Sequence, residues 1–276
     1  MMYLKNIDFS LINETEALKK LENLKTIIAN YDSAIIAFSG GVDSSFLAAV
    51  ARETLGEKAA LATAISETFP AHELEVSKKF AEKLGIRQIF IESSELDSED
   101  FRKNTKNRCY FCKKELFSKF LNEAKKMGFN KVFSGANFDD LNDFRPGLKA
   151  QKELDIASPL MEAKLTKLEI RWFSKKMNLD SWARPQMACL TSRFPYGVEF
   201  SREKFTKIEK CEDFLRQLGF SQYRVRYHNE LVRIEIEPGE FELLLKSREA
   251  IATEFKKYGF KFITLDIEGF RTGSFN

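Results

Sequence analysis

Long apolar segments are absent from this sequence of 276 residues, and their absence bears on where the protein works. The first residues lead into a charged helix expected over residues 14–30, and they lack the apolar core of roughly 7 to 15 residues that a signal peptide carries. The composition is 43% apolar and 31% charged, and the mean hydropathy is negative, as in ordinary soluble proteins. We therefore expect a cytoplasmic protein that does not bind membranes.

An excess of one charge is also absent. The formal net charge is +3, which is too close to neutral to indicate nucleic acid by itself, although Lys and Arg can still form local patches. The 26 phenylalanines show no repeat and no stacking-motif spacing, so we interpret them as packing residues. We expect no nucleic acid among the partners.

Cysteines are few, and in a cytosolic protein the four that occur are better interpreted as metal ligands or nucleophiles than as disulfides. Cys109 and Cys112 open an expected helix, so both sulfur atoms can point to one side. The neighbouring Arg108, Lys113 and the helix N-terminus favour thiolates. This environment suits an iron-sulfur cluster or zinc.

The other two cysteines differ in their surroundings. Cys211 shares a helical face with Ile208, Leu215 and Leu218, which predicts a buried, inert thiol. Cys189 lies in a loop bracketed by prolines and arginines, which suits a nucleophile or metal ligand, with a buried loop cysteine as the alternative. Three available thiols leave one iron of a cubane cluster open, whereas a structural zinc closed by all four cysteines is the competing interpretation.

The most informative motif occupies residues 39–45, which read Ser39-Gly40-Gly41-Val42-Asp43-Ser44-Ser45. It follows the apolar run 34–38 and precedes the helical pattern 46–50. A strand that turns through two glycines into a helix lets backbone N–H groups converge on one oxyanion, and the helix N-terminus adds roughly half a positive charge. No Lys-Ser/Thr pair ends a Gly-x-x-x-x-Gly spacing, so this is not a Walker A loop. The motif predicts a phosphate-binding loop, and a serine-capped helix after a buried strand is the alternative.

The pattern around this motif alternates between short apolar runs and amphipathic helices. We expect strands at 34–38, 59–65, 88–92 and 131–134, and helices at 44–54, 71–84 and 109–127. This predicts an α/β fold with a doubly wound parallel sheet, whose ligands bind beyond the carboxyl ends of the strands. The segment Gly135-Ala136-Asn137-Phe138-Asp139-Asp140 follows the last strand and should reach the same edge, either as ligand contacts or as helix caps.

The character of the sequence changes between residues 165 and 180. We expect a first domain over residues 1–170 and a smaller α+β unit over 171–276, with helices at 168–177 and 202–218 followed by a hairpin and another helix. A two-residue turn at Asn229-Glu230 places Arg226 opposite Arg233 and Arg224 opposite Glu235. Facing arginines repel unless an anion lies between them, so the hairpin is either a phosphate or carboxylate site or a solvated face.

The phosphate loop resembles the PP-loop of ATP pyrophosphatases, which cleave ATP to AMP and pyrophosphate. The resemblance implies that Ser39, Ser44 and Ser45 supply hydroxyls to the leaving pyrophosphate, and that Asp43 orients the loop or helps to hold Mg²⁺. We expect Gly40, Gly41 and Gly135 among the nucleotide-binding residues as well.

Further blocks extend this resemblance over nearly the whole chain. These are the Gly135 to Asp140 segment leading to Asp143-Phe144-Arg145-Pro146-Gly147-Leu148, Ser158-Pro159-Leu160, Thr166-Lys167-x-Glu169-Ile170-Arg171, Cys189-Leu190-x-Ser192-Arg193 and Arg271-Thr272-Gly273. Together they resemble the LarE family of ATP-dependent sulfur transferases, which make the thiocarboxylates of the nickel-pincer cofactor of lactate racemase. The resemblance implies that ATP adenylates a carboxylate of pyridinium-3,5-biscarboxylic acid mononucleotide and that sulfur then displaces AMP.

The resemblance also implies roles for the cysteines. Cys189 matches the position that in some members gives up its own sulfur and becomes dehydroalanine. Because this chain adds Cys109 and Cys112, it resembles the branch in which Cys109, Cys112 and Cys189 hold a 4Fe-4S cluster that carries an extra sulfide, replenished by a sulfide donor. A homo-oligomer such as a hexamer is expected, with the C-terminal unit at its interfaces. Independently of the resemblance, the facing arginines of the expected hairpin lead us to expect that Arg224, Arg226 and Arg233 bind the mononucleotide phosphate of the substrate.

Other functions stay open at this point. An amidotransferase-type synthetase, such as an NAD or GMP synthetase, would use the same loop but would need an ammonia source and not the three cysteines. A PP-loop enzyme that thiolates tRNA would use cysteines but usually needs a markedly basic surface, and the net charge of +3 weakly disfavours it. A non-catalytic scaffold would bind ATP without releasing pyrophosphate.

Overall fold

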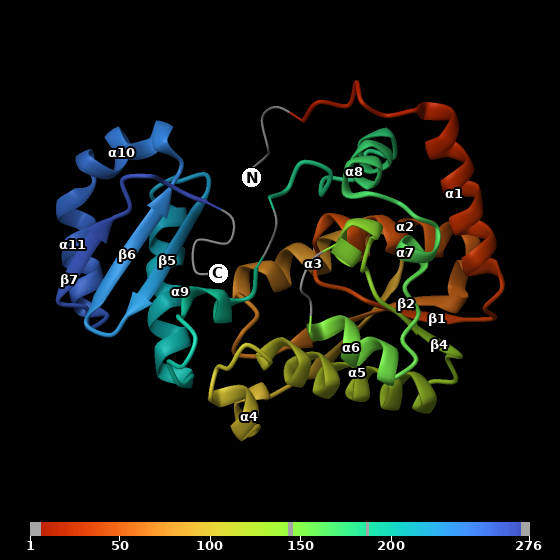
Figure 1. The fold of residues 1–276 in the computed structure, drawn as a ribbon, viewed down its shortest axis with the longest axis horizontal. Helices are drawn as coiled ribbons and strands as arrows, with labels where there is room; N and C mark the ends of the chain where they lie inside the picture. Colours follow the sequence, from red (N-terminus) through yellow and green to blue (C-terminus); the bar gives the residue numbers. More distant parts are fainter. Residues whose placement is uncertain (1–6, 143–145, 186–187, 272–276) are drawn as a thin grey trace. The chain divides into compact units, whose positions relative to one another are not determined.

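A computed structural model describes residues 7–142, 146–185 and 188–271 (Figure 1). The chain forms two compact units. Among the described residues, the larger unit comprises 7–95, 107–142 and 146–185, and the smaller unit comprises 96–106 and 188–271.

A four-stranded parallel sheet organises the larger unit, in the order β3-β2-β1-β4. Its strands are β1 Ala34–Ala37, β2 Ala59–Ile65, β3 Arg87–Glu92 and β4 Lys131–Phe133. All neighbouring pairs run parallel. The predicted strand positions are therefore confirmed to within one or two residues at each end.

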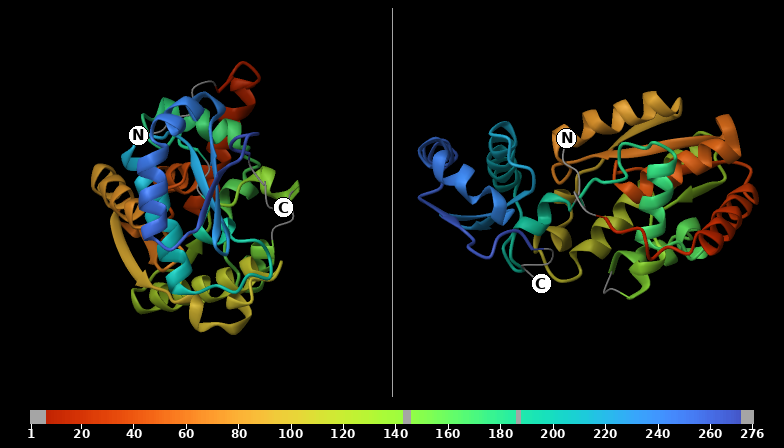
Figure 2. Two further views of the ribbon diagram at one scale, coloured as in Figure 1. Left: turned by 90° about the vertical axis from the view of Figure 1, so that its left-hand side faces the viewer. Right: turned by 90° about the horizontal axis from the view of Figure 1, so that it is seen from above.

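Helices cover both faces of this sheet, as Figures 1 and 2 show. They are α1 Glu14–Ala29, α2 Val42–Leu55, α3 Ala71–Leu84, α5 Arg108–Lys126, α6 Pro146–Glu153, α7 Pro159–Glu162 and α8 Lys167–Lys176, with 3-10 turns at Gly56–Lys58, Glu95–Asp97 and Phe138–Asn142. Successive side chains of β1 lie in the hydrophobic cores on opposite faces of the sheet. Ile36 belongs to the same cluster as Phe46 of α2, and Ile35 belongs to the same cluster as Phe117 of α5. This alternation confirms the predicted doubly wound fold.

The smaller unit contains a mixed three-stranded sheet in the order β5-β6-β7. Its elements are α4 Glu99–Arg102, a 3-10 turn at Leu190–Arg193, α9 Arg202–Gln217, β5 Tyr223–His228, β6 Leu231–Ile236, a 3-10 turn at Pro238–Glu240, α10 Phe241–Lys246, α11 Arg248–Lys257 and β7 Phe262–Leu265. The hairpin β5-β6 is antiparallel, and β7 joins β6 in parallel. The expected α+β character is confirmed, while β7 is a strand that the apolar pattern did not indicate.

Segment 96–106 belongs to the smaller unit although it interrupts the larger one. Phe101 is buried against Phe200, with ring centroids 5.1 Å apart. The buried Asn104 side-chain amide donates to the carbonyl oxygens of Pro195 at 2.7 Å and Val198 at 3.0 Å. These contacts join residues more than 90 positions apart in sequence.

The division between the units falls later than the predicted boundary at 170/171. The chain passes from the larger to the smaller unit between the described residues 185 and 188, because α8 contributes Ile170 and Phe173 to the core beneath α2. Phe173 stacks on Phe46 with ring centroids 5.8 Å apart. Across the residues that the structure describes, no helix is both long and apolar enough to cross a membrane.

Candidate active site

The predicted phosphate loop leads from β1 into α2 in the larger unit. After Phe38, whose N–H donates to the Ala62 carbonyl at 2.8 Å, the chain turns at Gly40 with φ of +74°. Only glycine adopts this left-handed conformation without strain. Gly41 is the N-cap of α2, and because glycine has no side chain that could accept from the helix, the first N–H groups of α2 are left for a ligand.

The serines of the loop have unequal partners. The Ser44 hydroxyl donates to the Gly41 carbonyl at 3.2 Å and contacts the Ser39 hydroxyl at 3.3 Å. Ser45 is 1% exposed, yet its hydroxyl has no hydrogen-bond partner among the described residues. A buried hydroxyl without a partner is costly, and a phosphate oxygen would satisfy it.

Asp43, in the first turn of α2, is paired with a cation. One carboxylate oxygen contacts the Lys167 ammonium from the start of α8, and the other accepts from the Asn137 amide at 3.3 Å. The Asp43 and Lys167 side chains are 21% and 34% exposed, so solvent reaches both. The sequence pattern assigned no role to Lys167, although it lies in the Thr166-Lys167-x-Glu169 block.

The loop after β4 comes close to the phosphate loop at Gly135. A Cβ atom at Gly135 would lie 3.2 Å from the Ser44 nitrogen and 3.3 Å from its Cα, so only glycine fits without displacing α2. Further along, the Asp140 carboxylate accepts from the Asn137 N–H at 3.0 Å, and the Asp139 carboxylate accepts from the Lys167 N–H at 2.8 Å. The two aspartates therefore cap main-chain groups, and Asn137 is the side chain of this loop that reaches Asp43.

Arg184 braces the phosphate loop from a distant part of the sequence. Its guanidinium donates to the Gly40 carbonyl at 2.9 Å and to the Glu73 carboxylate at 2.6 Å. Burial opposes ionisation of Glu73, but the hydrogen bond from His72 and the charge of Arg184 outweigh it and lower the pKa of the carboxyl. Arg171 in turn donates to the Trp182 and Arg184 carbonyl oxygens at 2.7 and 2.9 Å. Sequence reasoning missed this brace, because nothing local links Arg184 to residues 144 positions away.

Cys109 and Cys112 lie one turn apart at the start of α5, in the larger unit. Cys109 is exposed and Cys112 is partly buried, with its sulfur 3.9 Å from the Glu95 carboxylate. Glu95 is 2% exposed, and burial raises the pKa of its carboxyl, with the charges of Glu115 and Glu67 acting in the same direction. Glu95 is a neighbour of Cys112 that sequence reasoning did not identify.

Cys189 lies in the smaller unit, at the N-cap of the turn Leu190–Arg193. Its side chain is exposed, and its sulfur lies 2.8 Å from the Thr191 hydroxyl. The Cys189 carbonyl accepts from the Arg193 guanidinium at 3.1 Å, and Arg193 forms a buried two-point ion pair with Glu212 at 2.9 and 2.7 Å. The main chain beneath the thiol is therefore held by a charged pair within the core.

Cys211 is fully buried on α9, and burial raises the pKa of its thiol strongly. The predicted burial of this thiol is confirmed, and its inertness stays a prediction. In the parts of each unit that the structure describes, no group of three or more His, Cys, Asp or Glu residues is arranged to hold a metal ion. Because Cys109 and Cys112 belong to one unit and Cys189 to the other, a shared cluster stays a prediction. The donors suit one chemically, since three cysteines that form no disulfide and keep some exposure are what a cluster with one open iron requires.

The hairpin has the predicted register, with Arg226 opposite Arg233 and Arg224 opposite Glu235. No external anion is needed to relieve the facing pair, because the fully buried Glu235 accepts from Arg226 at 2.8 Å and from Arg233 at 3.0 Å. Arg226 is 4% exposed and also donates to the Ser192 carbonyl at 2.7 Å. Burial lowers the pKa of Arg224 to about 10, with Arg193 acting in the same direction. Substrate binding by Arg224 and Arg226 stays a prediction. The repulsion between Arg226 and Arg233 that suggested it is offset by Glu235 of the same hairpin.

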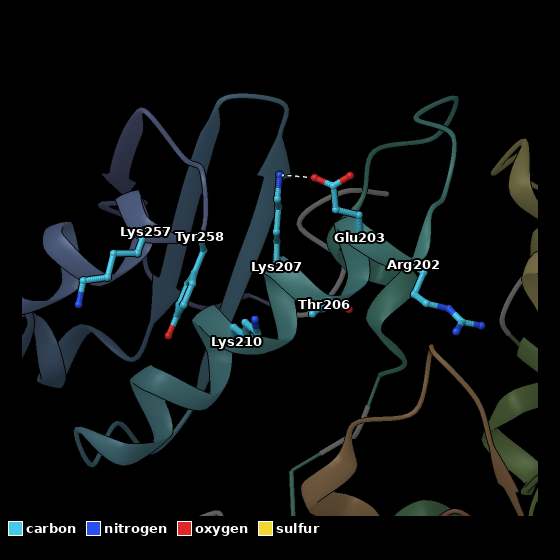
Figure 3. A pocket seen from close by; sticks show the side chains of 7 residues that line it. All are labelled: Arg202, Glu203, Thr206, Lys207, Lys210, Lys257 and Tyr258. Atoms are coloured by element: carbon cyan, nitrogen blue, oxygen red, sulfur yellow. Dashed lines mark ion pairs between the residues drawn. The ribbon is translucent and has the colours of Figure 1, made fainter.

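A separate basic pocket of about 430 Å³ lies on the smaller unit, between α9 and the end of α11 (Figure 3). Its lining consists of Arg202, Glu203, Thr206, Lys207, Lys210, Lys257 and Tyr258. Lys207 points to Glu203 and pairs with it at 2.7 Å. None of the residues predicted for the site lines this pocket.

A glycine turn between a parallel strand and a helix N-terminus, on a doubly wound sheet, defines a PP-loop domain of the kind found in ATP pyrophosphatases. The profile of the NAD synthase family matches residues 17–122, which include the loop. Over 263 residues the chain is 32% identical to the pyridinium-3,5-bisthiocarboxylic acid mononucleotide synthase of Lactiplantibacillus plantarum, covering 95% of each chain. It therefore belongs to the family of that enzyme, the LarE family.

Two other relatives match over similar lengths. An uncharacterized protein of Synechocystis is 40% identical over 259 residues, which is 93% of this chain and 97% of the relative. An uncharacterized protein of Methanocaldococcus jannaschii is 34% identical over 261 residues, which is 92% of this chain and 98% of the relative.

Proposed function

We propose that this enzyme uses ATP to adenylate a carboxylate of pyridinium-3,5-biscarboxylic acid mononucleotide and then inserts sulfur to give the thiocarboxylate. The observation that carries this proposal is the open phosphate loop, with Gly40 in its left-handed turn and the partnerless buried hydroxyl of Ser45. The similarity over 95% of the named synthase supports the choice of substrate and of sulfur insertion.

The first half-reaction is phosphoryl chemistry at the loop. A carboxylate oxygen of the substrate attacks the α-phosphorus of ATP, and the bond from that phosphorus to the bridging oxygen breaks, releasing pyrophosphate. The N–H groups at the start of α2 and the hydroxyls of Ser39, Ser44 and Ser45 stabilise the negative charge that develops on the leaving group. Asp43 would hold or orient Mg²⁺, which supplies further positive charge when bound.

In the second half-reaction a sulfur nucleophile attacks the acyl carbon, and AMP leaves with the electron pair of the broken carbon–oxygen bond. Cys109, Cys112 and Cys189 would hold a 4Fe-4S cluster. When bound, this group supplies a transferable sulfide. The Arg193–Glu212 pair fixes the main chain of Cys189, and the Thr191 hydroxyl lies against its sulfur.

Sacrificial transfer from Cys189 itself is the second candidate, favoured by the exposure of its thiol. In that case the cysteine sulfur passes to the acyl group, the Cβ–S bond breaks, and loss of the Cα proton leaves dehydroalanine. The chain would then complete a single turnover.

The test combines a product count with intact-protein mass spectrometry under anaerobic conditions. The protein, purified anaerobically, receives ATP, Mg²⁺, the mononucleotide and sulfide. Formation of AMP, pyrophosphate and more than one thiocarboxylate per chain, with Cys189 unchanged in mass, would support the cluster route. A loss of about 34 Da in step with product, the mass of one hydrogen sulfide leaving a thiol, would make Cys189 the consumed donor. Absence of both pyrophosphate and thiocarboxylate would contradict the proposed function.

A further inference from the structure

The start of α5 carries two cysteines that differ in their access to solvent. Cys109 is exposed, whereas Cys112, one turn further along, is partly buried. The Cys112 sulfur lies 3.9 Å from a carboxylate oxygen of Glu95, a residue that is 2% exposed. An open thiol next to a more sheltered one is the arrangement found where one cysteine reacts with an oxidant and its neighbour then forms a disulfide with it.

The geometry at the start of α5 allows the two cysteines to approach each other. Side chains three positions apart on an α-helix have Cβ atoms about 5–6 Å apart, and a disulfide requires about 3.5–4.5 Å, so the turn must tighten by roughly 1–2 Å. The Asn107 carbonyl accepts from Tyr110 N–H at 2.9 Å and from Phe111 N–H at 3.4 Å, so the shorter bond is the one that a 3-10 turn makes. In a 3-10 turn side chains three positions apart eclipse each other, which shortens the distance between them.

The surroundings of this turn favour an attacking thiolate at Cys109. The helix α5 is 19 residues long, and its N-terminus carries roughly half a positive charge, which stabilises an anion in the first turn. The sequence of that turn, residues 108–111, includes no acidic residue that would oppose this effect. Tyr110, between the two cysteines, donates to the Glu153 carboxylate of α6 at 2.7 Å, which anchors the turn while the sulfur atoms react.

We propose that Cys109 and Cys112, whenever no cluster is bound, form a redox-active dithiol that exchanges with low-molecular-weight disulfides. The Cys109 thiolate attacks one sulfur of the small disulfide, whose S–S bond breaks, and the first small thiol leaves with the electron pair. Cys112 then attacks the Cys109 sulfur of the mixed disulfide, and the second small thiol leaves. The two cysteine protons end on the two small thiols, so the small disulfide is reduced and the Cys109–Cys112 pair is oxidised.

This disulfide and a bound cluster exclude each other, because both need the same two sulfur atoms. Oxidation to a disulfide is reversible by thiols, whereas oxidation to a sulfonic acid is not. The exchange therefore protects the two cysteines while they hold no cluster, and reduction restores them as ligands. The inference does not depend on the proposed sulfur transfer, since no ATP and no mononucleotide take part.

Peptide mass spectrometry of the full chain tests the proposal. The protein is prepared without a cluster, reduced with dithiothreitol, desalted, incubated with oxidised glutathione, quenched with acid and digested with trypsin. Trypsin cleaves after Arg108 and Lys113, so both cysteines lie in the single peptide 109–113. We expect this peptide to lose about 2 Da, the two hydrogens given up when a disulfide forms, and dithiothreitol to restore its mass.

Two variants separate the roles of the thiols. Cys112→Ser removes the second thiol, so one glutathione should stay on Cys109, at a level at least roughly tenfold above that in the wild type. Cys211→Ser is the matched control, because Cys211 is buried on α9, and peptide 109–113 should oxidise in it as in the wild type. The measurement on the wild type needs no variant, so it decides the question even if Cys112→Ser does not fold. If peptide 109–113 of the wild type keeps both thiols, carries glutathione as a stable adduct or is joined to Cys189, the inference is overturned.

Discussion

Ser45→Ala is expected to stabilise the ligand-free protein and to weaken its binding of pyrophosphate. The Ser45 hydroxyl is buried, with no partner among the described residues, and such a group costs about 1–3 kcal/mol. Alanine also has a higher helix propensity by a few tenths of a kcal/mol. A net gain of roughly 1–2 kcal/mol in the free energy of unfolding would raise Tm by roughly 2 to 8 °C for a unit of this size.

The same substitution removes a hydrogen bond that we expect the hydroxyl to give to pyrophosphate. At a ligand concentration of 100 times the wild-type Kd, binding stabilises the folded state by about 2.7 kcal/mol. If the variant binds tenfold more weakly, the gain at the same concentration falls to about 1.4 kcal/mol. Thermal unfolding with and without pyrophosphate and Mg²⁺ therefore measures both effects in one series.

Ser44→Ala is the matched control for the stability of the free protein, because Ser44 lies in the same helical turn. The Ser44 hydroxyl already donates to the Gly41 carbonyl at 3.2 Å, so its removal should lower the stability of the free protein by about 1 kcal/mol. The reasoning is refuted if Ser45→Ala destabilises the free protein as much as Ser44→Ala does, since its hydroxyl would then have a partner in the native state.

Three further predictions concern other parts of the molecule. Asp43→Ala should keep the fold and reduce AMP and pyrophosphate formation by about a hundredfold, as expected for losing a preorganised charge-stabilising group; normal pyrophosphate release by the folded variant would contradict its role. Cys112→Ala should remove most iron and sulfide from anaerobically purified protein while Cys211→Ala changes neither, and equal metal content in both would refute the cluster ligands. Glu95→Gln should raise Tm at pH 8. Burial raises the pKa of the Glu95 carboxyl, so its ionisation destabilises the fold as the pH rises through that pKa. The gain in Tm should vanish at acidic pH, and an equal gain at pH 5 and pH 8 would rule out this cause.

Local signals predicted much of the fold. The limits of β2 and α3 follow from apolar runs, from periodicity and from Gly85 after the helix, which the structure confirms residue for residue. The pairing of Arg226 with Arg233 could be predicted from the two-residue turn at Asn229-Glu230, because the length of a hairpin turn fixes the register of the two strands.

What could not be predicted depends on side chains that meet across long stretches of sequence. Lys167 and Asp43 are 124 positions apart, and Arg184 and Gly40 are 144 apart. No periodicity encodes which cation reaches which loop, since packing of whole helices decides it. The register placed Glu235 opposite Arg224, but only the folded hairpin shows it accepting from Arg226 and Arg233.

The interruption of the larger unit by segment 96–106 has a consequence for synthesis on the ribosome. Phe101 and Asn104 are made long before their partners, since Asn104 binds a carbonyl 91 positions later. At roughly 5 to 20 residues per second, this delay lasts on the order of 5 to 18 seconds. Throughout that time Phe101, whose side chain becomes 1% exposed in the folded unit, lacks Phe200 and the other residues from 188 onward that cover it. The smaller unit therefore cannot fold completely until the C-terminal region has emerged from the ribosome. A chain truncated just before residue 188 would retain segment 96–106 but lack the residues that this segment packs against.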